Sequence, residues 1–155
     1  MTFTDEHDLE SHLRQLIKSQ ITTKHPYIYA FENKKAVDVV ICRDGKEPAV
    51  FFLEVKLFQA KHGRLGIGTG GGTGYQPEII ARSPHYLETH LRWVIVDSRQ
   101  TVPSFLFIPT SIVAKYLSGK TISAKFNNIQ LGIFRQVTAF SESQLIDEMS
   151  KWLLQ

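Results

Sequence analysis

Two apolar runs on either side of a short polar turn constrain the fold of this chain more than any other feature. The runs cover residues 36–43 and 49–57, and the sequence DGKEP at 44–48 separates them. Asp, Gly and Pro are typical of turns, and apolar runs of this length are typical of buried strands. The sequence therefore predicts an antiparallel hairpin at the centre of the fold.

This hairpin carries three charges in otherwise apolar surroundings. Asp38 is the one charge within 36–42, and Glu54 and Lys56 are the charges within 49–57. Glu54 and Lys56 are two residues apart, so their side chains share one face of a strand. Because burying an unpaired charge is costly, these groups need either mutual pairing or a chemical task.

The length of the turn decides whether Asp38 joins the other two charges. A hairpin centred on Lys46, with a loop of three or five residues, places Asp38 directly opposite Glu54, with Cβ atoms about 5 Å apart. A two-residue turn at Asp44 and Gly45 would put Asp38 on the other face. We expect the longer loop. Two carboxylates at this separation repel each other unless a cation lies between them.

The three charges have a chemical interpretation and a structural one. Oxygens of Asp38 and Glu54, with a strand carbonyl such as that of Val55, make a hard site suited to Mg²⁺, with Mn²⁺ as a substitute. Lys56 could then orient or deprotonate a water, or neutralise charge developing on a phosphate. The alternative is a buried salt-bridge triad without activity.

Asp38, with Glu54-Val55-Lys56 sixteen positions further on, resembles the motif of the PD-(D/E)XK nuclease superfamily, although Val37 stands where the family pattern often has proline. The resemblance implies an α/β (α+β) domain with the restriction-endonuclease-like fold, in which helices flank a mixed central sheet with an antiparallel catalytic hairpin. It also implies Mg²⁺-dependent hydrolysis of DNA phosphodiester bonds. Asp38 and Glu54 would be metal ligands, and Lys56 the catalytic lysine.

Members of this superfamily often add two further polar residues. One is an acid from the first helix, for which Glu10 is the candidate, with Glu6 as the other possibility. The second is a glutamine after the motif strand, for which Gln76 is the candidate. A solvated helix face for Glu10 and a helix-capping role for Gln76 are the structural alternatives.

A glycine-rich segment follows the motif strand. Seven of the ten glycines lie between Gly63 and Gly74. Backbone amides in such a segment can bind phosphates, so we expect contacts with DNA here. The candidate contacts are Lys61, His62, Arg64, Gly68, Thr69, Gly70, Thr73 and Arg82. The alternatives are a surface linker, a dinucleotide-binding enzyme that uses Gly66-x-Gly68-x-x-Gly71, and a non-catalytic DNA-binding module.

The remaining pattern predicts one domain over 1–155, with a nuclease core over about 5–110. Helices are expected over 5–19, where Thr4 caps the first turn, and over 111–117. Further helices are expected to begin at Pro77, to restart after Ser83-Pro84, and to begin at Ser141, where Gln144 completes a capping box. Strands are expected over 27–31, 93–97, 105–108 and 129–134. We expect residues 111–155 to serve recognition or assembly and to supply a closing helix.

The composition limits which partners and which cellular compartment suit this chain. The 155 residues carry a net charge of +3, which permits a nucleic-acid partner without requiring one. The lone Cys42 excludes an intrachain disulfide and a cysteine zinc cluster, and no apolar stretch is long enough for a membrane span. We expect a cytoplasmic protein in a reducing compartment.

The expected substrate is duplex DNA. Cutting both strands takes two active sites, so we expect a homodimer or homotetramer that cleaves at specific sequences, as restriction and intron-homing enzymes do. A Holliday-junction or other structure-specific nuclease is the alternative within the same fold.

Overall fold

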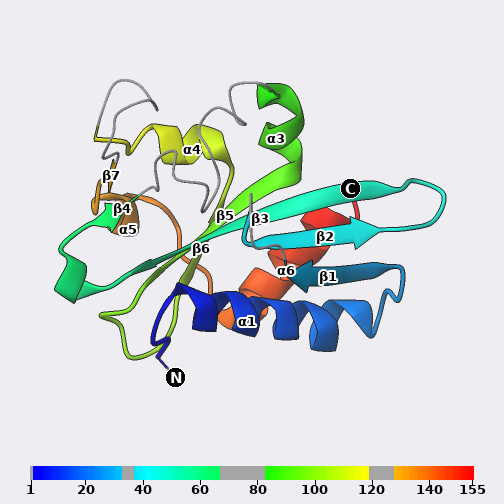
Figure 1. Cartoon of the computed structure of the whole chain (residues 1–155), viewed down its shortest axis with the longest axis horizontal. Coiled ribbons are helices and arrows are strands. Elements are labelled where there is room, and N and C mark those ends of the chain that lie inside the picture. The colour runs from blue at the N-terminus through cyan, green and yellow to red at the C-terminus, as the bar shows by residue number, and fades with distance from the viewer. Residues whose placement is uncertain (1, 33–36, 67–82, 119–127) are drawn as a thin grey trace.

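The computed structural model describes residues 2–32, 37–66, 83–118 and 128–155 (Figure 1). Its helical elements are α1 (Glu6–Leu16), the π-helix η1 (Ile17–Thr22), the 3-10 helix η2 (Ala60–His62), α3 (Pro84–His90), α4 (Thr110–Ala114), α5 (Ile133–Gln136) and α6 (Glu142–Leu153). Its strands are β1 (Ile28–Glu32), β2 (Val39–Arg43), β3 (Ala49–Phe58), β4 (Leu65–Gly66), β5 (Leu91–Asp97), β6 (Phe105–Ile108) and β7 (Asn128–Ile129).

A five-stranded mixed sheet with the order β1-β2-β3-β5-β6 forms the centre of the molecule. β2 is antiparallel to both β1 and β3, β5 lies parallel to β3, and β6 returns antiparallel to β5. β4 and β7 make a separate two-stranded sheet. The expectation of a mixed sheet flanked by helices is confirmed.

The hairpin register agrees with the sequence analysis. Val39 faces Leu53 and Arg43 faces Ala49, which leaves the five residues 44–48 as the connection. Gly45 has φ of 107°, a left-handed conformation that glycine adopts without strain. Continued by one residue, this register places Asp38 opposite Glu54. Asp38 itself lies in a bend just before β2, and its amide donates to the Leu53 carbonyl at 3.2 Å.

Two apolar clusters cover the two faces of the sheet. In Figure 1, α1 and α6 lie on one side of the sheet and α3 and α4 on the other. The first cluster includes Leu9, Leu13, Val55, Met149 and Trp152, so α1 and α6 pack on the face that carries the odd-numbered residues of β3. The second includes Phe58, Leu87, Trp93, Val113 and Ile133. In the described part of the chain, no helix combines the length and apolar character needed to cross a bilayer.

Several element boundaries differ from expectation. The cap of α1 is Asp5 rather than Thr4, and its side chain accepts from the Asp8 amide at 2.8 Å. The first helix continues as η1 to Thr22 because the π-helical turn keeps Ile21 in the core. The capping box at Ser141 and Gln144 is confirmed.

The predicted strand over 129–134 is wrong. Only Asn128–Ile129 pairs, with β4, and the chain then turns into α5, which buries Ile133. The predicted helix over 111–117 is shorter, because it is α4 (Thr110–Ala114), and Leu117 instead forms a bridge with Ile129. The helix expected from Pro77 lies outside the described residues.

Candidate active site

The candidate site lies where β3 runs on past the start of β2. Alternate amides of a strand point in the same direction, so the amides of Val55 and Leu57 point to the same edge of β3. This is the edge that β2 pairs with earlier in β3, but β2 does not extend as far as these two residues. Each is taken by a carboxylate: Val55 N–H donates to Asp38 Oδ2 at 2.6 Å, and Leu57 N–H donates to Glu6 Oε1 at 3.3 Å. The first helix and the bend before β2 thus each place one carboxylate at this edge of β3.

Glu54 and Lys56 form a buried ion pair on the face of β3 that the second cluster covers. Glu54 is 1% exposed and Lys56 is 8% exposed. Lys56 Nζ lies 3.3 Å from Glu54 Oε1 and 4.0 Å from Glu6 Oε2. A single ammonium therefore stands between carboxylates from two different elements.

Burial and mutual repulsion shape the ionisation of this group. Burial raises the pKa of Asp38, although the Val55 amide and Lys56 oppose that rise. Burial also raises the pKa of Glu6, against the effect of Lys56. Burial alone would lower the pKa of Lys56, but Glu54, Glu6 and Asp38 together outweigh it and leave that pKa raised. The lysine is therefore a firmly held cation, and it offsets part of the effect of burial on the acids around it.

Glu10, one helical turn beyond Glu6, belongs to the margin of the same group. Burial, followed by the like charge of Asp38, raises its pKa to about 7. Its Oε2 lies 3.9 Å from Arg14 Nη1 and 3.8 Å from His7 Nδ1. Glu10 is therefore electrostatically coupled to Asp38, and its side chain is half-buried on the flank of α1.

The donors present suit a hard divalent cation. Carboxylate oxygens and a strand carbonyl are the ligands that Mg²⁺ takes in proteins, and this ion keeps several waters. Among the described residues, no three His, Cys, Asp or Glu side chains are grouped to hold a metal by themselves. The expected ligand set needs only two, Asp38 and Glu54, together with the Val55 carbonyl. The pKa values of Asp38 and Glu10 are raised, and a divalent cation bound beside them would lower both values because it favours the ionised carboxylates.

The structure brings together Asp38, Glu54, Val55 and Lys56, and of the two candidate acids of the first helix it is Glu6 that contacts Lys56. Sequence reasoning placed Glu10 in the catalytic group, whereas Glu6 is the helix acid that contacts Lys56. The four-residue spacing of Glu6 and Glu10 puts both on one flank of α1, but the spacing alone does not show which one reaches β3.

The predicted DNA contacts divide into two groups. Lys61, His62 and Arg64 are described, and all three are exposed just after β3, with Lys61 and His62 in η2. Gly68, Thr69, Gly70, Thr73 and Arg82 lie outside the described residues, and so does Gln76, the candidate catalytic glutamine.

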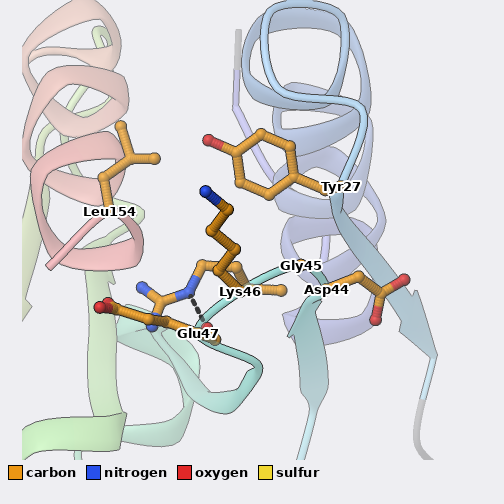
Figure 2. A pocket seen from close by; sticks show the side chains of 7 residues that line it. Tyr27, Asp44, Gly45, Lys46, Glu47 and Leu154 are labelled. Atoms are coloured by element: carbon orange, nitrogen blue, oxygen red, sulfur yellow. Dashed lines mark hydrogen bonds between the residues drawn. The ribbon is translucent and has the colours of Figure 1, made fainter.

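A hollow of about 500 Å³ at the tip of the β2–β3 hairpin is a separate feature (Figure 2). Tyr27, Lys46 and Leu154 line it, together with Arg43. The Arg43 guanidinium donates to the Glu47, Leu153 and Gln155 carbonyls at 2.9, 2.7 and 2.8 Å. This hollow lies at the opposite end of β3 from Lys56, and its arginine holds backbone carbonyls together, so we assign it no part in the chemistry.

Comparisons of the chain with family models, with curated proteins and with solved structures each gave no match. The site therefore has to be interpreted from its own geometry.

Proposed function

We propose that this chain is a Mg²⁺-dependent endodeoxyribonuclease that hydrolyses DNA phosphodiester bonds. The observation that carries the proposal is the ion cluster at the end of β3, where Lys56 is buried against Glu54 and Glu6 while Asp38 holds the next amide of the strand. The order of elements supports it as well. A helix, an antiparallel three-stranded meander, a helix and a strand parallel to β3 follow one another, as the resemblance to the PD-(D/E)XK superfamily implies.

Each residue has a role in this proposal. Asp38, Glu54 and the Val55 carbonyl would hold Mg²⁺, which when bound would supply an activated water and neutralise phosphate charge. The Lys56 ammonium would donate to a phosphate oxygen, on which negative charge develops during hydrolysis. Glu6 and Glu54 would keep Lys56 protonated and aimed at that oxygen. Glu10 would add negative charge that favours the cation.

A purely structural salt-bridge cluster is the alternative. Replacing a buried ion pair by apolar side chains of similar volume is often neutral or stabilising. Stability therefore gives little reason to keep charges within a buried strand, whereas phosphodiester hydrolysis needs a cation site beside a lysine. This contrast favours a catalytic role for Lys56 and its carboxylates.

A plasmid digest tests the proposal. Supercoiled plasmid is incubated with the purified chain in Mg²⁺, in Mn²⁺ and in chelator, and is then analysed on a gel. We expect nicking or linearisation with either metal and none in chelator. Asp38→Asn and Lys56→Met should each lower the cleavage rate by on the order of a thousandfold, because the first weakens a metal ligand and the second removes the cation that would stabilise negative charge on the reacting phosphate.

Lys151→Ala is the matched control, since Lys151 is an exposed lysine of α6 that pairs with Glu148 on the same helix. Circular dichroism of all variants checks that they are folded. Full cleavage by Asp38→Asn or Lys56→Met would rule out this site. Discrete fragments and a homodimer or homotetramer in light scattering would favour sequence-specific duplex cleavage of the restriction or homing type. Cutting confined to junctions or other irregular substrates would favour a structure-specific nuclease.

A further inference from the structure

The start of the chain lies beside the end of β3, beyond the last residue that pairs with β2. Gln59 directly follows β3, and its side-chain Nε2 donates to the Thr4 carbonyl at 2.5 Å. Two residues back along the chain, the Leu57 amide donates to Glu6 Oε1. The two contacts advance in opposite directions along the two segments, as the bonds of an antiparallel pair do. Residues 4–6 therefore lie along the edge of β3 that β2 leaves open.

The Thr4 carbonyl is available for this bond because it lies outside α1. Asp5 is the cap of the helix, and its carbonyl already accepts a helical bond from the Leu9 amide at 3.2 Å. A carbonyl that precedes the cap has no such partner within the helix and needs another donor or water. Gln59 supplies that donor, so its side chain joins the end of β3 to the residue before the helix cap.

The position of the first helical turn matters for the candidate active site because Glu6 is the first residue of α1. Glu6 Oε1 accepts from the Leu57 amide at 3.3 Å, and Glu6 Oε2 lies 4.0 Å from Lys56 Nζ. Both are long contacts of their kind, so a small shift of the first turn would break them. The Glu6 side chain is 44% exposed, so the surrounding side chains restrain it only in part.

Phe3 is a second anchor for the start of the chain. It is buried, and its ring centre lies 6.3 Å from that of Phe105 and 5.2 Å from that of His12. Apolar packing is not directional, whereas a hydrogen bond sets both a distance and an angle. Phe3 therefore keeps the segment against the core, and the bond from Gln59 fixes where the segment lies along β3.

We propose that Gln59 is a positioning residue of the candidate active site. Its bond to the Thr4 carbonyl sets the first turn of α1 so that Glu6 reaches both β3 and Lys56. The inference rests on the proposed nuclease function, in which Glu6 keeps the Lys56 ammonium aimed at the reacting phosphate. Gln59 differs from Gln76, the candidate catalytic glutamine, because it acts through Glu6 and not on the substrate.

Amide hydrogen exchange measured by NMR tests the positioning role without DNA or metal. Gln59→Met keeps an unbranched side chain of similar length and removes the donor. Protection of the Leu57 amide should fall about tenfold, because its carboxylate acceptor is no longer held in place. The Val55 amide is the internal reference, since Asp38 holds it at 2.6 Å from the other side of the site, and its protection should stay unchanged.

A double-mutant cycle in plasmid cleavage tests whether Gln59 acts through Glu6. Gln59→Met and Glu6→Ala should each lower kcat about tenfold and change KM less than about twofold, because each disturbs the aim of Lys56 and not the binding of DNA. The double variant should lose no more than either single variant. A glutamine with a merely structural role would give losses that multiply. Gln15→Met, at an exposed position of α1, is the control and should leave both constants unchanged.

The two measurements have separate outcomes. Unchanged protection of the Leu57 amide in Gln59→Met would overturn the proposal, because Phe3 would then be sufficient to hold the segment. Equal losses at Val55 and Leu57 would also overturn it, because the whole end of β3 would then have loosened. Selective loss at Leu57, with no cleavage by the unaltered chain in Mg²⁺, would reject the nuclease and keep the positioning role of Gln59. Mg²⁺-dependent cleavage with multiplying losses in the double variant would do the reverse.

Discussion

β3 and β5 are neighbouring central strands that differ in one respect. They are parallel and in register, with Glu54 beside Trp93 and Lys56 beside Ile95 on the same face of the sheet. All four side chains are buried. In β5 these positions are apolar, as expected for a strand covered on both faces, whereas in β3 they hold an ion pair.

The comparison shows that one strand of this buried layer is filled by apolar side chains alone. β5 fills the same layer with Trp93 and Ile95, and the Trp93 indole N–H finds Thr110 Oγ1 at 2.9 Å. Lys56 has to be accommodated by Glu54 and by Glu6, which α1 brings to the edge of β3. The contrast between an apolar and a charged strand in one layer is the physical basis for assigning chemistry to β3.

Placing a charge in β5 removes the difference between the two strands, and of all the variants it should have the largest effect on stability. Ile95→Lys would bury a second ammonium beside Lys56, with the nearby carboxylates already engaged, and should lower the free energy of unfolding by about 3–5 kcal/mol. Urea denaturation measures this. Ile95→Met, which conserves volume, should cost less than about 1.5 kcal/mol. Equal, small losses in both variants would mean that β5 tolerates charge as β3 does.

Making β3 resemble β5 should separate stability from activity. The double variant Glu54→Leu/Lys56→Met removes both charges together, so no unpaired ion remains, and its stability should be unchanged or higher by about 1–4 kcal/mol. Cleavage of plasmid should be lost. A large loss of stability in the double variant would instead indicate that the ion pair is structural.

The excess of carboxylates at the end of β3 predicts an unusual pH dependence. The pKa of Glu10 rises from 4.5 to about 7 on folding. Between these values the native state binds more protons than the unfolded state, so the free energy of unfolding should fall as pH rises, by about 2 kcal/mol. The raised pKa values of Asp38 and Glu6 act in the same direction.

Denaturation at pH 5 and pH 8 measures this fall, and Glu10→Gln should reduce it. Mg²⁺ should also reduce it, because a bound cation favours the ionised carboxylates. Stability that rises over this interval would show that the acids are better stabilised in the native state than their burial implies.

The local features of the hairpin could be predicted from sequence. The turn residues and the apolar runs over 36–43 and 49–57 predict the two strands, a loop longer than two residues and the register that aligns Asp38 with Glu54. These features depend on neighbours in the chain and on the period of a strand. The last helix is predicted for the same reason, since Ser141 and Gln144 form its capping box.

What the sequence does not reveal depends on distant packing. The contact of Glu6 with the Leu57 amide exists because β2 begins at Val39 while β3 continues, and no local pattern encodes that difference in length. The apolar residues of 129–134 match a strand as well as a short helix. Their assignment is decided by Ile133, which packs in the cluster under α3 and α4.

The contribution of α6 to the core has a consequence for biosynthesis. Leu145, Met149 and Trp152 complete the cluster on the α1 side of the sheet, and the Trp152 indole reaches across to the Thr89 carbonyl at the end of α3. During translation the part of this face that α6 covers must stay exposed until residues 142–153 have left the ribosome, although α1 and all five sheet strands have emerged earlier. Until α6 has emerged, the nascent chain therefore exposes apolar side chains of the sheet, and this is the interval when a chaperone would matter most.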